Sequence, residues 1–94
     1  MLYEIISDAV QNDASDIHLT TNQFPVLRIH GELTRLENYG LLSGEFMERS
    51  VSELLTEENL EKYRREKNVD VSFVYDERRF RVHIFRQQNT DAIA

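Results

Sequence analysis

The hydrophobic and polar positions of the first third of the chain follow two different periods. Apolar residues spaced three and four apart predict an amphipathic helix over residues 2–12. Strict alternation then predicts a strand over residues 16–20 and a hairpin over residues 25–36, which turns near Gly31. A two-residue turn would pair Ile29 with Glu32, whereas a three-residue loop would pair Ile29 with Leu33. The sequence leaves both registers open.

The middle of the chain carries two helix-start signals. Ser43 is a predicted N-cap, and the helix that follows would bury Met47, Val51, Leu54 and Leu55. Thr56 is a second predicted N-cap, and Leu60 and Tyr63 are the apolar anchors of its helix. Residues 37–42 are predicted to form a loop.

The clearest alternation comes late and predicts a second hairpin, with a tight turn at residues 76–79. If Phe73 pairs with Phe80, one face of the hairpin collects six apolar side chains that would be buried: Val69, Val71, Phe73, Phe80, Val82 and Ile84. The other face then places Ser72 opposite Arg81 and Asp70 opposite His83. With no carboxylate directly opposite it in this register, the Arg81 guanidinium is expected to be free.

Residues 91–94 begin another apolar stretch at the end of the sequence. They are interpreted as a final strand cut short, so that the chain would be a fragment of a longer protein. Such a strand would leave an unfinished sheet edge, and weak self-association that strengthens with salt is expected from it.

The order of these elements predicts the fold class. Helix, three strands, two helices and two strands indicate an α+β domain with a mainly antiparallel sheet and helices packed on one face. With 94 residues, the chain is long enough for a single domain, residues 1–94.

Charge and composition narrow the function classes. The net charge of −6 opposes nucleic-acid binding, and no apolar run is long enough for membrane insertion. Cysteine is absent, which excludes disulfides and cysteine metal sites. The charge is uneven, however, because residues 78–90 carry four arginines and no acid, so the rest of the chain carries −10. This local asymmetry is the main electrostatic clue.

Catalytic motifs are not found in the sequence. None of Gly31, Gly40 and Gly44 is followed by the lysine of a phosphate-binding loop, and no metalloprotease motif occurs. The three histidines are interpreted as strand residues rather than metal ligands. The outward stripe of Arg79, Arg81 and His83 is the best candidate constellation, because arginine suits bidentate phosphate recognition.

Four short segments together resemble one family. Residues 14–19, ASDIHL, resemble the A-S-D-[IL]-H-[IL] signature of type IV pilus and type II secretion ATPases. Residues 24–31, FPVLRIHG, resemble the P-P-x-x-R-[VI]-D-G of the PilT-type twitching motility subgroup. Residues 70–73, DVSF, and 79–87, RFRVHIFRQ, resemble its D-x-S-F and R-F-R-V-N-x-F-x-Q. The segments follow the family's order and spacing.

The sequence also departs from the family at four points. Phe24, His30 and His83 stand where the family has proline, aspartate and asparagine, and residues 88–90, QNT, replace its arginine-glycine.

The resemblance implies an N-terminal PAS-like domain whose ATPase core lies outside these 94 residues. The fragment itself would hold no cofactor, whereas the parent protein would bind ATP and Mg²⁺. Its partners would be the ATPase cores of its own and a neighbouring subunit in a homohexamer, and the pilus motor base at the inner membrane. The location would be cytoplasmic, peripheral to that membrane. By motif, Arg81 is the residue expected to approach the nucleotide phosphates, and Arg28 matches a motif arginine without an assigned role.

Two other interpretations stay open at this point. The domain could be a PAS-like module that binds a small ligand or a partner, which a pocket of mixed apolar and polar lining would favour. It could also belong to a pilus assembly or type II secretion motor instead of a retraction motor.

Overall fold

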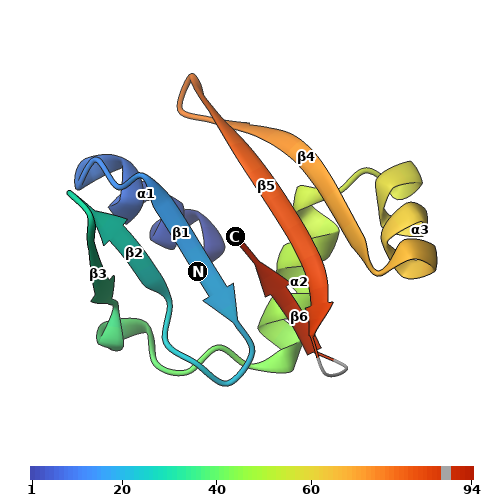
Figure 1. Ribbon diagram of the computed structural model, residues 1–94, viewed down its shortest axis with the longest axis horizontal. Coiled ribbons are helices and arrows are strands. Elements are labelled where there is room, and N and C mark those ends of the chain that lie inside the picture. The colour runs from blue at the N-terminus through green and yellow to red at the C-terminus, as the bar shows by residue number, and fades with distance from the viewer. Residues whose placement is uncertain (88–89) are drawn as a thin grey trace.

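A six-stranded antiparallel sheet with the order β3-β2-β1-β6-β5-β4 organises the computed structural model, which describes residues 1–87 and 90–94 (Figure 1). The strands are β1 (Asp16–Thr20), β2 (Val26–Ile29), β3 (Glu32–Arg35), β4 (Asn68–Tyr75), β5 (Arg78–Gln87) and β6 (Thr90–Ile93). The predicted α+β class with a mainly antiparallel sheet is confirmed. Residues 88 and 89, two of the positions that depart from the family pattern, lie outside the described residues.

Two helices cover one face of the sheet and a third lies at its end. In Figure 1, α1 (Leu2–Gln11) and α2 (Gly44–Leu54) lie behind the strands, whereas α3 (Glu57–Glu66) lies beside β4. The core between sheet and helices is closed by side chains that are almost fully buried: Ile5, Leu19, Met47, Ile84 and Ile93. No helix of the described residues is long and apolar enough to cross a bilayer.

The predicted helix caps are both present. The Ser43 hydroxyl accepts a hydrogen bond from the backbone N–H of Phe46 at 3.1 Å, and the Thr56 hydroxyl accepts one from that of Asn59 at 3.2 Å. Each such cap stabilises a helix by about 1 kcal/mol, because it satisfies a backbone donor that the helix leaves without a partner. The two caps therefore fix where α2 and α3 begin.

The segment predicted as a loop over residues 37–42 is partly structured. It contains a short 3₁₀ helix, Glu37–Tyr39, and the fully buried Leu42. The Tyr39 hydroxyl donates to the Asp8 carboxylate on α1. Burial, together with this bond, raises the pKa of Tyr39 to about 12. These contacts fasten the connection between β3 and α2 to the first helix.

Both hairpins close through two-residue turns. His30 and Gly31 have φ of 50° and 83°, and Ile29 pairs with Glu32, which settles the register that the sequence left open. In the second hairpin Asp76 and Glu77 form the turn, with φ of 51° and 62°. The prediction of a turn spanning residues 76–79 was too long, because β5 already begins at Arg78.

The register predicted for the second hairpin is confirmed, with Phe73 opposite Phe80. Its six apolar residues do share a face, but only Val69, Val82 and Ile84 are fully buried. The other three are half-buried because the hairpin tip extends past the helices (Figure 1). There the ring of Tyr3 covers Phe73 at 6.4 Å between centroids.

The last strand does not lie at the edge of the sheet, contrary to the expectation from the sequence. β6 lies between β1 and β5 and pairs with both, so the outer strands of the sheet are β3 and β4. The expectation of self-association through an unpaired edge at residues 92–94 is therefore wrong in its premise. Local alternation identified the strand, but a strand's neighbours are set by long-range contacts that alternation does not encode.

Candidate functional site

A groove with a volume of about 520 Å³ lies past the end of β6, between β1 and β5. Its inner wall is apolar and includes Ile17, Phe80 and Val82. Its outer rim is polar and includes the side chains Asp16, Asp70, Arg79, Arg81 and His83. The rim thus contains the whole arginine-histidine stripe that the sequence singled out.

Arg81 is not free, contrary to the expectation. Its Nε donates to Asp70 Oδ1 at 3.1 Å and its Nη2 donates to Asp70 Oδ2 at 2.7 Å. Asp70 lies diagonally across the two strands, since the residue directly opposite Arg81 is Ser72. A long side chain can reach a diagonal neighbour on the same face of a sheet. The sequence-based expectation considered only the residue directly opposite Arg81 and therefore missed Asp70.

The ion pair between Asp70 and Arg81 shifts the pKa of both groups but leaves most of the Arg81 side chain exposed to solvent. The hydrogen bonds from Arg81 lower the pKa of the Asp70 carboxyl, and the same bonds raise the pKa of the Arg81 guanidinium. The Arg81 side chain is still 83% exposed. A guanidinium has five N–H donors, so several are left for a second acceptor once Asp70 is bound.

A second arginine–aspartate pair lies on β1 and β2. Arg28 Nε is 3.1 Å from Asp16 Oδ2, and the two residues are directly opposite in the strand register. The motif arginine at position 28 therefore forms a cross-strand ion pair on the outer face of the sheet. Asp16 belongs to the rim of the groove, so an aspartate that is paired with an arginine lies on each side of the rim.

Arg79 is the residue that matches the expected free guanidinium. It is exposed on the same face as Arg81 and lines the same groove. Within residues 1–87 and 90–94 no carboxylate forms an ion pair with it. Val74 lies directly opposite Arg79 across the strand pair, and Arg81 follows it along β5 on the same face.

The histidines do not converge. His18 and His83 lie on β1 and β5, as predicted, but His30 lies in the turn of the first hairpin and not on a strand. The ring of His83 stacks on Phe85 at 5.1 Å. Among the residues that the structure describes, no group of three histidine or acidic side chains could hold a metal ion.

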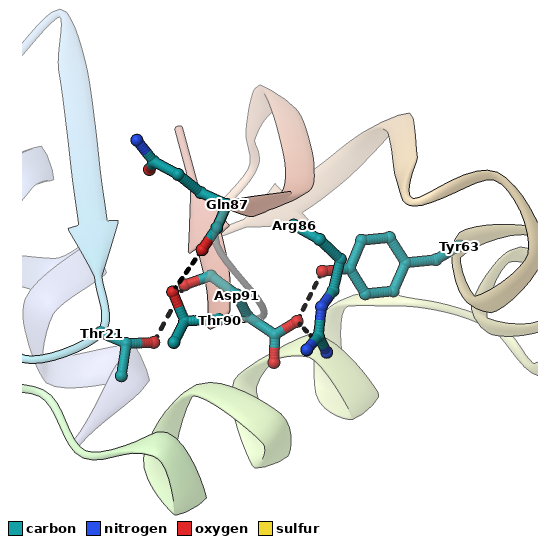
Figure 2. Close-up of polar contacts among 6 residues, drawn as sticks. All are labelled: Thr21, Tyr63, Arg86, Gln87, Thr90 and Asp91. Carbon is teal, nitrogen blue, oxygen red and sulfur yellow. Dashed lines mark hydrogen bonds and ion pairs between the residues drawn. The ribbon is translucent and has the colours of Figure 1, made fainter.

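A buried polar cluster anchors β6 to the rest of the domain (Figure 2). The Tyr63 hydroxyl on α3 donates to Asp91 Oδ1 at 2.5 Å, and Arg86 Nη1 lies 3.4 Å from the same oxygen. The Thr21 hydroxyl donates to the backbone oxygen of Asp91 at 3.0 Å. Burial, together with the bond to Asp91, raises the pKa of the Tyr63 hydroxyl.

Sequence reasoning missed this cluster. The sequence pattern marks Tyr63 only as an apolar anchor and Asp91 only as the start of the final strand. The available signal was the single acid within an otherwise apolar end segment, since a charged residue inside a buried strand needs a partner.

The fold is shared with solved structures. One is the pilus retraction motor PilT crystallised with bound ADP, with a TM-score of 0.85 and 33% identity over 96% of this chain. The chain is similar to part of PilT, which is a member of the type II/IV secretion ATPase superfamily. The resemblance noted in the sequence is thereby confirmed, as is the expected likeness to the N-terminal domain of PilT.

The chain spans 26% of the length of PilT. The Legionella pneumophila ATPase DotB has the same fold, with a TM-score of 0.77 and 20% identity over 98% of this chain, which again spans 26% of that protein. No protein-family model and no curated protein matches the chain.

The segments that resemble the PilT-type motifs have a defined place in this domain. The ASDIHL segment contains most of β1, and the FPVLRIHG segment contains β2 and its turn. The last two segments lie on β4 and β5. Both arginine–aspartate pairs join residues of different motifs, so these motifs meet on the outer face of one sheet.

We predict that Asp70 titrates below the ordinary range of an aspartate, and that Arg81→Ala returns its pKa upward. Since the folded pKa is lowered, the pair stabilises the fold above the unfolded pKa of Asp70, and this contribution disappears as the pH falls through the folded pKa. Carboxyl chemical shifts followed by NMR across acidic pH measure the effect. Arg79→Ala is the matched control and should leave the Asp70 titration unchanged; an equal change in both variants would contradict the assignment.

We predict that Tyr63→Phe lowers the free energy of unfolding by about 1–3 kcal/mol, because the substitution removes the hydroxyl that donates a hydrogen bond to the buried Asp91 carboxylate. Urea denaturation measures the loss. Tyr3→Phe is the control, since Tyr3 is 42% exposed and its substitution should change stability by no more than about 0.5 kcal/mol. Equal losses in the two variants would show that the Tyr63–Asp91 bond contributes nothing specific.

Proposed function

We propose that this chain is the N-terminal, PAS-like domain of a hexameric type IV pilus retraction ATPase. In this proposal the domain packs against the ATP-binding core of its own subunit and against that of a neighbour, and it moves relative to them during nucleotide turnover. The protein acts in the cytoplasm, at the pilus motor base on the inner membrane. ATP and Mg²⁺ bind to the core and not to this domain.

One observation carries the proposal. PilT, which is described as a pilus retraction motor with bound ADP, matches 96% of this chain with a TM-score of 0.85. Three of the four motif segments lie on the two hairpins of the domain. An assembly or secretion motor is the alternative within the same superfamily, and the fold shared with DotB supports only that broader assignment.

Arg81 is the residue proposed to act on the nucleotide. It is 83% exposed, and Asp70 holds its guanidinium through two hydrogen bonds, which positions the remaining N–H donors toward solvent. An arginine held in this way is already ordered, so it loses little further conformational entropy when it binds a phosphate. Asp70 is then a positioning residue for Arg81.

A second candidate function is a PAS-like module that binds a small ligand or a partner. The groove favours it, because its volume of about 520 Å³ and its mixed apolar and polar lining suit a ligand. Calorimetric titration of the 94-residue chain with nucleotides and with apolar acids separates the two candidates. Binding of a small ligand in the groove would support the second.

We predict that Arg81→Ala lowers ATP turnover in the full-length protein by up to about 10³-fold while the ring still assembles. The guanidinium would otherwise stabilise charge that develops on the phosphates. Steady-state phosphate release and sedimentation velocity measure turnover and assembly. The melting temperature of the domain should fall only slightly, because the Asp70–Arg81 pair is exposed and exposed ion pairs contribute little to stability.

Arg79→Ala is the matched control for turnover. It removes a guanidinium from the same rim of the groove without touching Asp70. If neither variant changes turnover, Arg81 has no role toward the nucleotide. If only Arg79→Ala lowers it, the role belongs to Arg79.

We also predict that the 94-residue chain alone releases no phosphate from ATP. None of its three glycines belongs to a phosphate-binding loop with lysine, which is the element that holds the β- and γ-phosphates. A coupled phosphate assay on the purified chain provides the measurement. Release above background that survives further purification would refute the prediction.

A further inference from the structure

Asp70 lies beside two basic side chains on the outer face of the second hairpin. Arg81 binds both of its carboxylate oxygens from the diagonal position, through hydrogen bonds of 3.1 and 2.7 Å. His83 is its directly opposite partner across β4 and β5. The sequence departs from the PilT-type pattern at His83, where that pattern has asparagine. This chain therefore places a titratable ring next to the carboxylate that holds Arg81.

The strand register brings the Asp70 and His83 side chains close together. The backbone N–H and C=O of His83 bond to Ala94 on β6, at 3.0 and 2.9 Å, so they point away from β4. Asp70 and His83 are therefore a non-hydrogen-bonded pair, the type in which opposite Cα atoms are only about 4.5 Å apart. The ring of His83 stacks on Phe85, at 5.1 Å between centroids, which keeps it on this face.

The charged and titratable groups that share the outer face with His83 come from β4, β5 and β1, since β6 presents alanines there. They are Asp70 on β4, Arg79 and Arg81 on β5, and Asp16 and His18 on β1. The Asp16 carboxylate is paired with Arg28 at 3.1 Å, on strands that β6 separates from β5. Of these two acids, Asp70 is thus the one that faces His83.

The charge of this group depends on the protonation of His83. With a neutral ring, the two arginines and Asp70 sum to +2 − 1 = +1, and a protonated ring raises the sum to +2. Histidine is the side chain whose charge ordinarily changes between about pH 5 and 8. Because His83 and Arg81 are two positions apart on one strand, the added charge lies about 7 Å from Arg81. At that distance in water a unit charge changes the affinity for a single negative charge about threefold.

The same proton weakens the pairing of Arg81 with Asp70. The pKa of Asp70 is lowered chiefly by the hydrogen bonds from Arg81, and the charge of His83 lowers it further. Once the ring is protonated, two cations share one carboxylate and repel each other. The guanidinium then leaves Asp70 more readily for another anion.

We infer that His83 is a proton-sensitive positioning residue for Arg81, and that its protonation strengthens the binding of a phosphoryl-like anion at Arg81 and Arg79. For the source of that anion the inference rests on the proposed function: in the longer ATPase it is the phosphate chain of the nucleotide. An asparagine at this position has no charge to gain, so it could not exert this control.

Sulfate is the probe for the isolated chain, because its charge is constant over the histidine range whereas that of phosphate is not. NMR titrations at constant ionic strength, followed at the Arg81 Nε–H signal, give the sulfate affinity at about pH 8 and about pH 5.5. Asp70 stays ionised at both values, since its pKa is lowered. His83 is exposed, so substitutions there should leave the fold intact.

The native chain should bind sulfate about threefold or more tightly at the lower pH. His83→Asn should lose most of this difference, and His83→Lys should bind tightly at both values because its charge is constant. His30→Asn is the matched control, since it removes a histidine from the turn of the first hairpin and should keep the native difference. Asparagine tolerates the φ of 50° at that position.

An equal pH dependence in His83→Asn and in the native chain would overturn the inference. A loss of the same size in His30→Asn would also overturn it, because the effect would then belong to the overall charge. These titrations involve no ATP turnover, so their failure is distinguishable from a failure of the proposed function.

The full-length protein tests whether the anion is the nucleotide. The ratio of kcat/KM for ATP in the native protein to that in His83→Asn should rise about threefold between about pH 8 and pH 6. Taking the ratio cancels the titration of ATP itself. A constant ratio, together with the expected sulfate result, would overturn the nucleotide as the source and assign the site to a free anion.

Discussion

The insertion of β6 between β1 and β5 is the constraint on which the rest of the structure depends. Each outer part of the sheet is assembled locally, one by the hairpin of β2 and β3 and the other by that of β4 and β5. Among the described strands, β6 is the one that joins them in the sheet, and it does so by contacts between residues about 70 positions apart, such as Thr21 and Asp91. Ile93 lies beside Leu19 and Ile84 on the face that the helices cover, so β6 makes that apolar face continuous.

The buried carboxylate of Asp91 shows how this insertion is secured. A charge that is 8% exposed is unfavourable unless hydrogen bonds compensate for its lost hydration. Tyr63 from α3 and Arg86 from β5 provide them, so the third helix is fastened to the same strand that joins the sheet. The cluster therefore couples the position of α3 to that of β6.

Alternation and capping signals in the sequence were sufficient for the local structure. They located the strands, both N-caps and the register of the second hairpin, because these depend on neighbouring residues. They did not place β6, since the pairing of distant strands depends on the whole core. At the candidate site they found the stripe with Arg79 and Arg81 but missed the bond to Asp70, which requires a diagonal reach across two strands. The Tyr63–Asp91 pair was missed because it joins two elements that share no sequence pattern.

The double pairing of β6 also decides how the domain would respond to mechanical load. A strand at the edge of a sheet peels away one hydrogen bond at a time when it is pulled sideways. A strand bonded on both sides and pulled along its own axis loads the bonds to β1 and β5 together, so that they must shear at once. Tension applied along β6 at its C-terminal end therefore loads the bonds to β1 and β5 at the centre of the sheet together.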